Sequence, residues 1–355
     1  MALSVLGIDS VLGIDIGSYA AKVTVLGGVK GRRANLLGLG MAQLPMEAVL
    51  NWEENPAPAR VAISQAMKNL AARFQLTARY VSTSVSGDSI VVKKINMPAM
   101  GEAELKRAVA GEAGQYIPFP LPEVNISHHV LEKDPDTGAL VVLLVAARKK
   151  VIQNYMEVMA VARLRPAVID VDGLAICNAY AFANPDNRDN AVLVDIGANK
   201  IAIIILNNGA PMIIKDEPGG GQHLTNEIGD RFNLSQVQAE AVKFGAEPAP
   251  NPGEAAEAVD RAAANWMAAV ERVMDAARQE SPGYRPSRIC LSGGSSLIPG
   301  LAEEFGRHFH LETQLFNPLL AVNYSPKKYD PEYIRHVGPQ MAVSFGLALR
   351  KVEHQ

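Results

Sequence analysis

Two stretches of the sequence place an aspartate and then a glycine at the end of a short, apolar, β-branched run. The first is VLGIDIGSYAAK at residues 11–22, and the second is VLVDIGANK at residues 192–200. Such runs are typical of strands buried on both faces. Glycine lets the backbone turn tightly, exposed N–H groups suit phosphate oxygens, and an aspartate can hold Mg²⁺ through water. Each stretch is a candidate phosphate-binding turn, although a buried strand that ends in an ordinary turn leaves the same pattern.

These stretches share an internal repeat, GIDIGS at residues 13–18 and VDIGAN at residues 194–199. Two such turns, facing each other, could clasp one polyphosphate from both sides. Two glycine pairs fit the same chemistry. Gly220 and Gly221 precede a predicted helix, whose N-terminus is a ready anion site, and Gly293 and Gly294 form a backbone shelf with Ser295 after a predicted strand. A further VLGID at residues 5–9 is not followed by Ile-Gly-Ser, so we assign the site to the copy at residues 11–15 and treat the earlier one as a lead-in segment.

The composition excludes several classes of protein. The 34 Lys+Arg and 37 Asp+Glu give a net charge of −3, and no basic run supplies the charge that a nucleic-acid binder needs. Cys177 and Cys290 lie in apolar runs, which predicts small core residues rather than a disulfide or a metal site. The longest apolar runs are much shorter than the roughly 20 residues that cross a bilayer, and the N-terminus lacks the basic region of a signal peptide. We expect a soluble protein of two domains.

The elements that position these motifs follow from periodicity and from turn residues. An N-terminal meander of strands reaches residue 44, and a helix at 59–74 and a strand at 80–85 follow. Residues 89–164 read as a self-contained insert, with strands at 90–95, 125–131 and 140–146 and helices at 101–116 and 150–163. The remaining elements are a strand at 167–171, a helix at 172–182, strands at 191–195, 201–206 and 212–215, helices at 224–232, 236–244 and 254–280, a strand at 287–291, a loop-rich segment at 317–339 and a helix at 338–350.

Taken together, these motifs resemble the actin-like ATPase superfamily and, within it, the PilM family of type IV pilus assembly proteins. Residues 15–18 look like the first phosphate motif, 195–198 the second and 291–300 the adenosine motif. Residues 168–180 and 338–348 are similar to the two connecting helices of the interdomain hinge. More specific to the PilM family are YIPFP at 116–120, VLVDIGAN and the ending GPQMAVSFGLALR. The YIPFP segment is explained equally well by packing and by a partner surface.

This resemblance implies an α/β, actin-like (ribonuclease H-like) two-domain fold with a 1C subdomain insert of the type found in FtsA and PilM. It divides the chain into subdomain 1A (residues 1–88, with 338–355 returning to it), the 1C insert (89–164), subdomain 2A (165–230, with 283–337) and subdomain 2B (231–282).

The same resemblance implies ATP or ADP with Mg²⁺ as cofactors. Asp15 and Asp195 would bind the metal through water. The residues that would contact the nucleotide are Gly17, Ser18, Tyr19, Lys22, Gly197, Ala198, Asn199, Lys200, Gly220, Gly221, Glu240, Lys243, Gly293, Gly294 and Ser295. For Glu240 and Lys243, a plain i,i+3 ion pair on a helix is the alternative.

Hydrolysis of the nucleotide is left open, and we expect slow turnover at most. Asp172 stands where related chaperones carry the group that orients the attacking water, but an aspartate there could equally cap the helix. Lys200 follows Asn199 where the superfamily usually offers Thr or Ser. It could neutralise phosphate charge, or it could fill the site and weaken metal binding. His128 and His129 have no acid or Cys at ligand spacing, so no metal site is expected there.

The resemblance implies a cytoplasmic ATP-binding scaffold that links the inner-membrane alignment complex of the pilus to cytoplasmic components. Its expected partner is the N-terminal cytoplasmic peptide of PilN, in a groove between subdomains 1A and 1C. Pilus motor ATPases and a second copy of the chain are further candidates, and contact with the membrane would run through partners because only residues 351–355 follow the last helix. The alternatives are an FtsA-like filament-forming ATPase and a small-molecule kinase of the same superfamily.

Overall fold

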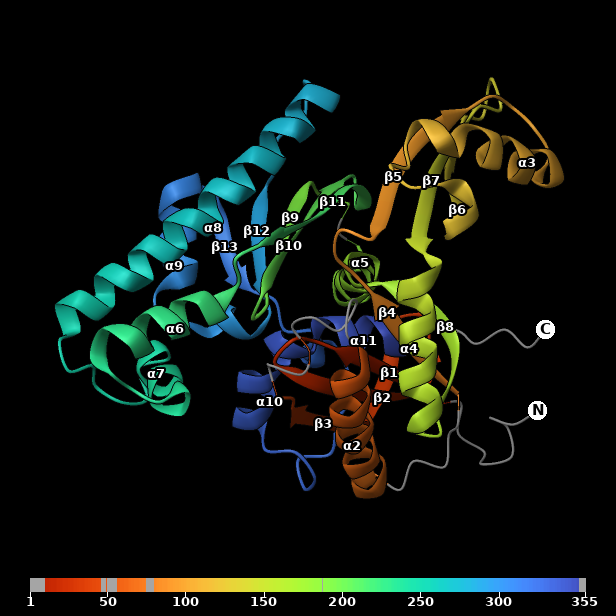
Figure 1. Ribbon diagram of the computed structural model, residues 1–355. Helices are drawn as coiled ribbons and strands as arrows, with labels where there is room; N and C mark the ends of the chain where they lie inside the picture. Colours follow the sequence, from red (N-terminus) through yellow and green to blue (C-terminus); the bar gives the residue numbers. More distant parts are fainter. Residues whose placement is uncertain (1–9, 46–48, 50–55, 75–79, 187, 351–355) are drawn as a thin grey trace.

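Two five-stranded sheets with the same order and the same strand directions form the frame of the molecule (Figure 1). The computed structural model describes residues 10–45, 49, 56–74, 80–186 and 188–350, so the first VLGID copy lies outside the described residues. In each sheet, two antiparallel pairs join the first three strands, and two parallel pairs add the others. The internal repeat seen in the sequence therefore extends to the whole sheet.

The strands of the two sheets correspond one to one. The first sheet has the order β3-β2-β1-β4-β8, and its strands are β1 (Ser10–Ile16), β2 (Ala20–Lys30), β3 (Arg33–Gln43), β4 (Tyr80–Val85) and β8 (Arg165–Val171). The second has the order β11-β10-β9-β12-β13, and its strands are β9 (Ala191–Ile196), β10 (Lys200–Asn207), β11 (Ala210–Pro218), β12 (Arg288–Ser292) and β13 (Glu312–Leu315).

Alternation of side chains places a separate core on each face of the second sheet. Ile201, Ile203 and Ile205 of β10 pack into one core, whereas Ala202 and Ile204 pack into the other. Because both faces are covered, the strand is apolar at successive positions instead of alternating apolar with polar residues. This explains why the run at residues 201–206 is continuous.

Four helices contribute to the core on one face of the second sheet. They are α6 (Gly221–Phe232), α7 (Gln236–Lys243), α8 (Pro252–Glu280) and α9 (Leu301–Phe309). Helix α10 (Pro331–Val337) instead adds Ile334 and Val337 to the core on the other face. Trp266 and Val270 of α8 lie in the core on one face of the sheet. Short 3₁₀ turns span Ala113–Gln115, Leu121–Glu123, Gly294–Leu297, Pro318–Ala321 and Gly338–Met341.

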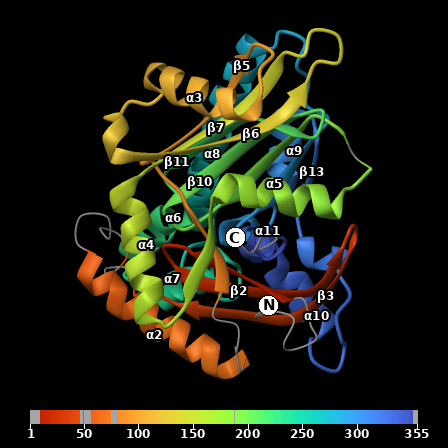
Figure 2. The ribbon, with the colours of Figure 1, turned by 90° about the vertical axis from the view of Figure 1, so that its right-hand side faces the viewer.

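Two helices link the lobes. In Figures 1 and 2, α5 (Asp172–Ala183) lies between the two sheets, beside α11 (Ala342–Ala348). Their contact is close, because a Cβ added to Gly346 would lie 1.8 Å from the carbonyl oxygen of Ala175. Both helices belong to a core that takes residues from both sheets, such as Leu26 of β2 and Leu193 of β9. The two lobes are therefore joined by a shared core as well as by the chain.

The insert has its own three-stranded sheet of order β5-β7-β6. Its elements are β5 (Ile90–Met97), α3 (Glu102–Glu112), β6 (Val124–Lys133), β7 (Leu140–Arg148) and α4 (Lys149–Val161). A separate hydrophobic core includes Leu105, Val109 and Val142. Helix α4 leaves this unit and runs beside α2 (Pro56–Phe74), where Val158 and Met159 join the core of the first lobe (Figure 2).

The structure changes several expectations about the elements. The predicted division places residues 165–171 in the second domain, but β8 pairs with β4 in the first sheet. We therefore propose that the first domain extends to Val171. The segment expected to be loop-rich contains α10, and β13 has no counterpart among the predicted strands. Cys177 and Cys290 are buried free thiols, as predicted. Among the described residues, no helix is both long enough and apolar enough to span a membrane.

Candidate functional site

A cavity of about 840 Å³ lies between the two lobes. Both candidate phosphate turns contribute to its wall, and a cavity of this size is typical of small-ligand sites, which run from roughly 300 to 1,000 Å³. The predicted site residues that line it are Asp15, Gly17, Ser18, Tyr19, Lys22, Asp172, Asp195, Gly197, Ala198, Asn199, Lys200, Glu240, Lys243, Gly294 and Ser295. Residues far apart in the sequence are thus brought to one cavity.

The two turns have matching backbone geometry. The Gly17 N–H donates to the Ala20 carbonyl at 3.1 Å, and the Gly197 N–H donates to the Lys200 carbonyl at 3.0 Å. In each turn the next two residues, Ser18 and Tyr19 or Ala198 and Asn199, have no backbone acceptor for their N–H among the residues that the structure describes. Each turn therefore presents backbone donors at the cavity wall, which suits phosphate oxygens.

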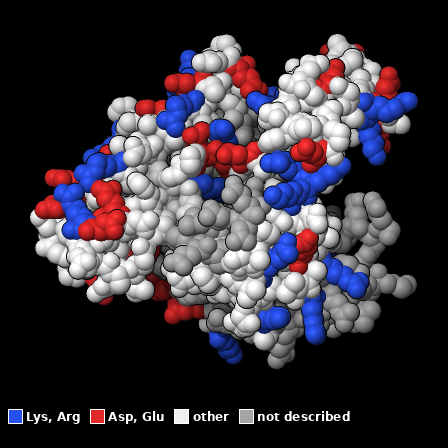
Figure 3. Space-filling view, in the orientation of Figure 1, with Lys and Arg blue, Asp and Glu red and all other residues white. Residues whose placement is uncertain are grey.

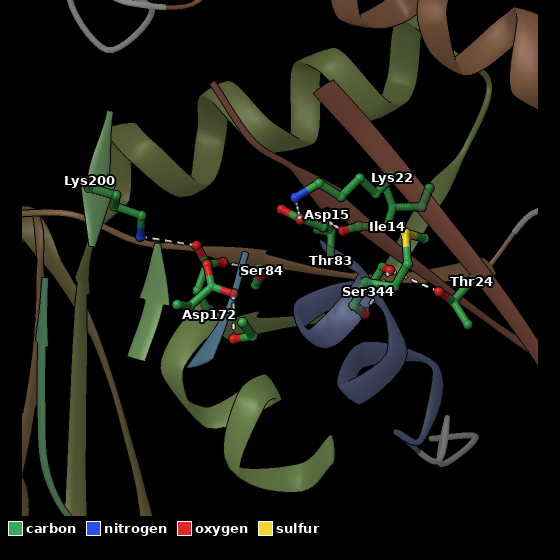
Figure 4. A network of polar contacts seen from close by, with 12 residues as sticks. Ile14, Asp15, Lys22, Thr24, Thr83, Ser84, Asp172, Lys200 and Ser344 are labelled. Atoms are coloured by element: carbon green, nitrogen blue, oxygen red, sulfur yellow. Dashed lines mark hydrogen bonds and ion pairs between the residues drawn. The ribbon is translucent and has the colours of Figure 1, made fainter. Parts of the chain in front are cut away.

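Asp15 and Asp195 lie near the ends of β1 and β9, and both act electrostatically on the ammonium of Lys22. Lys22 stands opposite Asp15 in the β1–β2 register, and its Nζ lies 3.0 Å from Asp15 Oδ2 (Figure 4). Burial alone would lower the pKa of Lys22, but the carboxylates of Asp15 and Asp195 outweigh it and the pKa is raised. Burial raises the pKa of both aspartates, against the effect of Lys22. Two carboxylates beside one ammonium leave an excess of negative charge, which suits a hydrated divalent cation.

Asp195 is fixed in a different way from Asp15. Its Oδ2 accepts a hydrogen bond from Ser292 Oγ at 2.8 Å, across the parallel pairing of β9 with β12. Among the described residues, no group of three or more His, Cys, Asp or Glu is placed to hold a metal ion directly. Asp195 is thus held by a hydroxyl and Asp15 by an ammonium.

Asp172 takes part in a polar network rather than in capping. The N-cap of α5 is Val171, without a side-chain cap, so the alternative role predicted for Asp172 is wrong. Instead, Ser84 Oγ donates to Asp172 Oδ1 at 2.6 Å, and Lys200 Nζ donates to Asp172 Oδ2 at 3.1 Å (Figure 4). Lys200 also lies 2.9 Å from Asp216 Oδ2. Burial opposes the charged form of Lys200, but Asp172 and Asp216 raise its pKa overall.

Glu240 and Lys243 line the cavity and also form an ion pair. Lys243 Nζ lies 2.7 Å from Glu240 Oε1 and 2.9 Å from Thr225 Oγ1. Burial lowers the pKa of Lys243, and Glu240 opposes this shift. Burial and then Glu240 raise the pKa of Tyr19, which belongs to the first lobe. Both predicted roles are therefore compatible with the geometry, since the pair faces Tyr19 across the cavity.

Gly220, Gly221 and Gly293 do not line the cavity but support its wall. The Gly221 N–H donates to the Gly197 carbonyl at 2.9 Å, and the Gln222 N–H donates to the Ala198 carbonyl at 2.8 Å. The first donors of α6 thus hold the second phosphate turn instead of remaining open to an anion. Gly293 has φ +85°, and a Cβ there would lie 2.5 Å from the Ile196 carbonyl oxygen.

We expect Gly221→Ala to displace the second phosphate turn, because the added Cβ would lie 1.8 Å from Ser295 Oγ and 2.8 Å from Ser295 Cβ. Overpacking of this kind costs roughly 1–3 kcal/mol. Thermal unfolding should show the loss, and the double variant Gly221→Ala/Ser295→Gly should recover most of it because the clashing atoms are gone. A double variant as unstable as the single one would contradict this account.

Several cavity residues were missed at the sequence level. Ser86 and Gly87 follow β4, His336 comes from the segment expected to be loop-rich, and Gln340 comes from the start of the predicted C-terminal helix. An apolar part of the wall is made by Ile16, Met41, Ile63 and Tyr155. These residues belong to no recognisable sequence motif, and they come together only because elements that are distant in the sequence are neighbours in the fold. Ser-Gly after a strand, at residues 86–87, was the one available signal.

Charged side chains do not gather into a single basic area on the face shown in Figure 3, where blue and red groups are interspersed over a mostly white surface. This agrees with the net charge of −3. The geometry favours an anionic small molecule held between two backbone turns, with lysines as counter-charges and carboxylates for a hydrated cation.

Comparison with known proteins gives matches over nearly the whole chain. A family model described as "Type IV pilus assembly protein PilM" matches residues 13–352. A solved structure described as "PilM-PilN type IV pilus biogenesis complex" has 28% sequence identity and a TM-score of 0.83, covering 97% of this chain and 99% of that chain. The agreement spans both lobes and the insert.

Two further likenesses are to ethanolamine utilization proteins EutJ. The structure from Carboxydothermus hydrogenoformans has 15% identity and a TM-score of 0.50, covering 96% of this chain and 89% of that chain, which shows the fold alone. The protein from Escherichia coli (strain K12) is 29% identical over 154 residues, which are 41% of this chain and 50% of that protein. The chain thus spans about half the length of this relative. The predicted actin-like, two-domain α/β fold is confirmed by these likenesses.

Proposed function

Because this chain belongs to the family of type IV pilus assembly protein PilM, we propose that it is a cytoplasmic, nucleotide-binding scaffold of type IV pilus assembly. It would hold PilN by the N-terminal peptide of that protein and so reach the inner membrane through a partner. Support comes from the match over residues 13–352 and from the TM-score of 0.83 to a structure described as a PilM-PilN complex.

The main support for nucleotide binding is that two turns of matching backbone geometry line the same cavity. Their N–H groups would hold the polyphosphate of ATP or ADP, with Lys22 nearby as a counter-charge. Asp15 and Asp195 would hold Mg²⁺ through water, and the ion would neutralise phosphate charge. The base and ribose would lie toward Glu240, Lys243, Gly294 and Ser295, with Gly220, Gly221 and Gly293 supporting the wall from behind.

The contacts of Asp172 are consistent with nucleotide hydrolysis that is slow at most. Its two carboxylate oxygens are engaged by Ser84 and Lys200. Both oxygens of this carboxylate are thus held by the protein's own donors, and neither is reserved for an attacking water. We therefore assign Asp172 to the polyphosphate side of the cavity, with a catalytic role only after Lys200 has left it.

For the partner, we propose that the N-terminal PilN peptide binds between the first lobe and the insert. Helix α4 connects the two, since it follows the last strand of the insert and packs into the core of the first lobe. A peptide seated there would sense any movement of the insert relative to the first sheet.

The test is a calorimetric titration of this protein with the N-terminal peptide of PilN from the same organism, with and without ATP and Mg²⁺. We expect saturable binding at concentrations on the order of tens of micromolar or below, and an affinity that changes when nucleotide is present, because a ligand that favours one state of the lobes shifts the other binding equilibrium. A peptide of scrambled order is the control. Absence of binding under both conditions would overturn the assignment of the partner but not that of the nucleotide.

A further inference from the structure

A chain of polar contacts crosses from one lobe to the other at the edge of the cavity. We call it the interlobe clasp, and it consists of Ser84 and Gly87 of the first lobe, Asp172 of the linking helix, and Lys200 and Asp216 of the second lobe. Lys200 lies at its centre, 3.1 Å from Asp172 Oδ2 and 2.9 Å from Asp216 Oδ2. Ser84 Oγ and the Gly87 N–H complete it, at 2.6 Å from Asp172 and 2.7 Å from Asp216 respectively.

The clasp closes on the base of the insert. Gly87 has φ +91°, and its carbonyl accepts from the Ile90 N–H at 3.1 Å, in the turn that starts β5. Strand β5 lies against β11, the strand that carries Asp216. Lys94 of β5 also approaches Glu280 at the end of α8, at 3.9 Å. The position of the insert relative to the second lobe therefore depends on the contacts that Asp216 makes.

Lys200 is the point at which the two halves of the internal repeat differ. Alignment of Asp15 with Asp195 places Lys200 opposite Ala20 and Lys22 opposite Ala202. Lys22 faces Asp15 across its own hairpin, whereas Ala202 faces Asp195. The ammonium of the second hairpin thus stands beside its turn, where it reaches Asp172 and Asp216 instead of the aspartate of its own repeat.

We propose that Lys200 couples the polyphosphate of a bound nucleotide to the interlobe clasp. When nucleotide binds, the Lys200 ammonium breaks its contacts with Asp216 and Asp172 and contacts phosphate oxygens instead. The inference rests on the proposed nucleotide site. Lys200 already lines the cavity. A bound polyphosphate presents several negatively charged oxygens, which would compete with the two carboxylates of Asp172 and Asp216 for the Lys200 ammonium. The Lys200 side chain retains 31% exposure, so it has room to change partners.

Opening of the clasp has two consequences. Asp216 loses its cation and holds only the Gly87 N–H, so the root of the insert is less firmly attached to the second lobe. Asp172 keeps Ser84 but loses the ammonium, so one carboxylate oxygen becomes able to accept from water. Lys200 is thus a positioning residue that acts through Asp216 and Asp172 on the insert.

Hydrogen exchange of the full-length protein tests this inference through the amides of residues 86–90. In the unaltered protein, we expect ATP with Mg²⁺ to speed exchange of the Gly87 amide by roughly tenfold, because Asp216 loses the ammonium that fixes its position beside Gly87 and local opening becomes easier. ADP in place of ATP identifies which phosphate is needed. In Lys200→Met, exchange should already be fast without nucleotide and should no longer respond to it.

Lys215→Met is the matched control, since Lys215 is exposed on the same strand as Asp216 and no contact of its side chain is found among the described residues. It should behave as the unaltered protein. Asp216→Asn provides a second test, because it keeps an acceptor for Gly87 but removes the charge that binds Lys200, and it too should lose the response to nucleotide. Calorimetry separates the possible failures. Nucleotide that binds without changing the Gly87 amide would overturn the clasp alone, whereas nucleotide that does not bind would overturn the proposed site.

Discussion

Asp15→Asn is expected to weaken the binding of ATP with Mg²⁺ by at least roughly tenfold, because a contact to a charged group contributes about 1.5–3 kcal/mol and about 1.4 kcal/mol is a factor of ten. The change keeps the size of the side chain and removes the charge that faces Lys22 at 3.0 Å. Asp195→Asn should have an effect of the same order, since it removes the second carboxylate of the pair. Calorimetric titration of each variant with ATP and Mg²⁺ measures the loss.

Two controls make this test specific. Asp230→Asn changes an exposed carboxylate on α6, outside the cavity, and should leave the affinity unchanged. A thermal melt without nucleotide is needed for Asp15→Asn, because the variant leaves the ammonium of Lys22 with less compensation in a buried place. Unchanged affinity in both Asp15→Asn and Asp195→Asn would remove the assignment of the cation site.

Gly346→Ala, which adds a single methyl group, is expected to lower the free energy of unfolding strongly. The added Cβ would lie 1.8 Å from the Ala175 carbonyl oxygen and 2.5 Å from its carbon. Both are backbone atoms of α5, so relief requires that the two linking helices move apart. We expect a decrease of about 3 kcal/mol in the free energy of unfolding, at the upper end of ordinary overpacking.

Chemical denaturation of the protein without ligand measures this decrease. Gly111→Ala is the matched control, because Gly111 lies in α3, is exposed, and a Cβ there would meet no atom within 4 Å. That change should instead stabilise the protein by about 0.5–1 kcal/mol, since alanine is the better helix former. If Gly346→Ala unfolded at the same denaturant concentration as the unaltered protein, the close helix contact would be contradicted.

The sequence allowed the strands around each phosphate turn to be predicted because their signal is local. An apolar β-branched run, an acid and a glycine are enough to define both Asp15 and Asp195. The insert was also found from its own periodicity and turns. In contrast, β13 has only four residues, ETQL, with little apolar pattern, and α10 is a helix of seven residues. Short elements of this kind depend on tertiary contacts more than on their own propensity.

The boundary after the insert could not be placed from the sequence for a different reason. Residues 165–171 form a strand in either division, and only its pairing with β4 decides the sheet to which it belongs. The partners of Lys200 were hidden in the same way, since Asp172 and Asp216 lie on different elements and are brought together by the fold. The sequence showed that Lys200 departs from the usual hydroxyl residue, and its geometry shows which acids take up its charge.

The packing of α11 on β1 bears on the order in which the chain matures during synthesis. A Cβ on Gly13 would lie 2.1 Å from the Ser344 carbonyl oxygen, and Ser344 Oγ lies 2.8 Å from Thr24 Oγ1, so one of the last helices of the chain covers the first strands. The ribosome releases β1 and β2 long before it has made residues 342–348. The second sheet is therefore translated before the helix that covers this part of the first sheet exists, so we expect the contact between α11 and β1 to form only after the second sheet has been made.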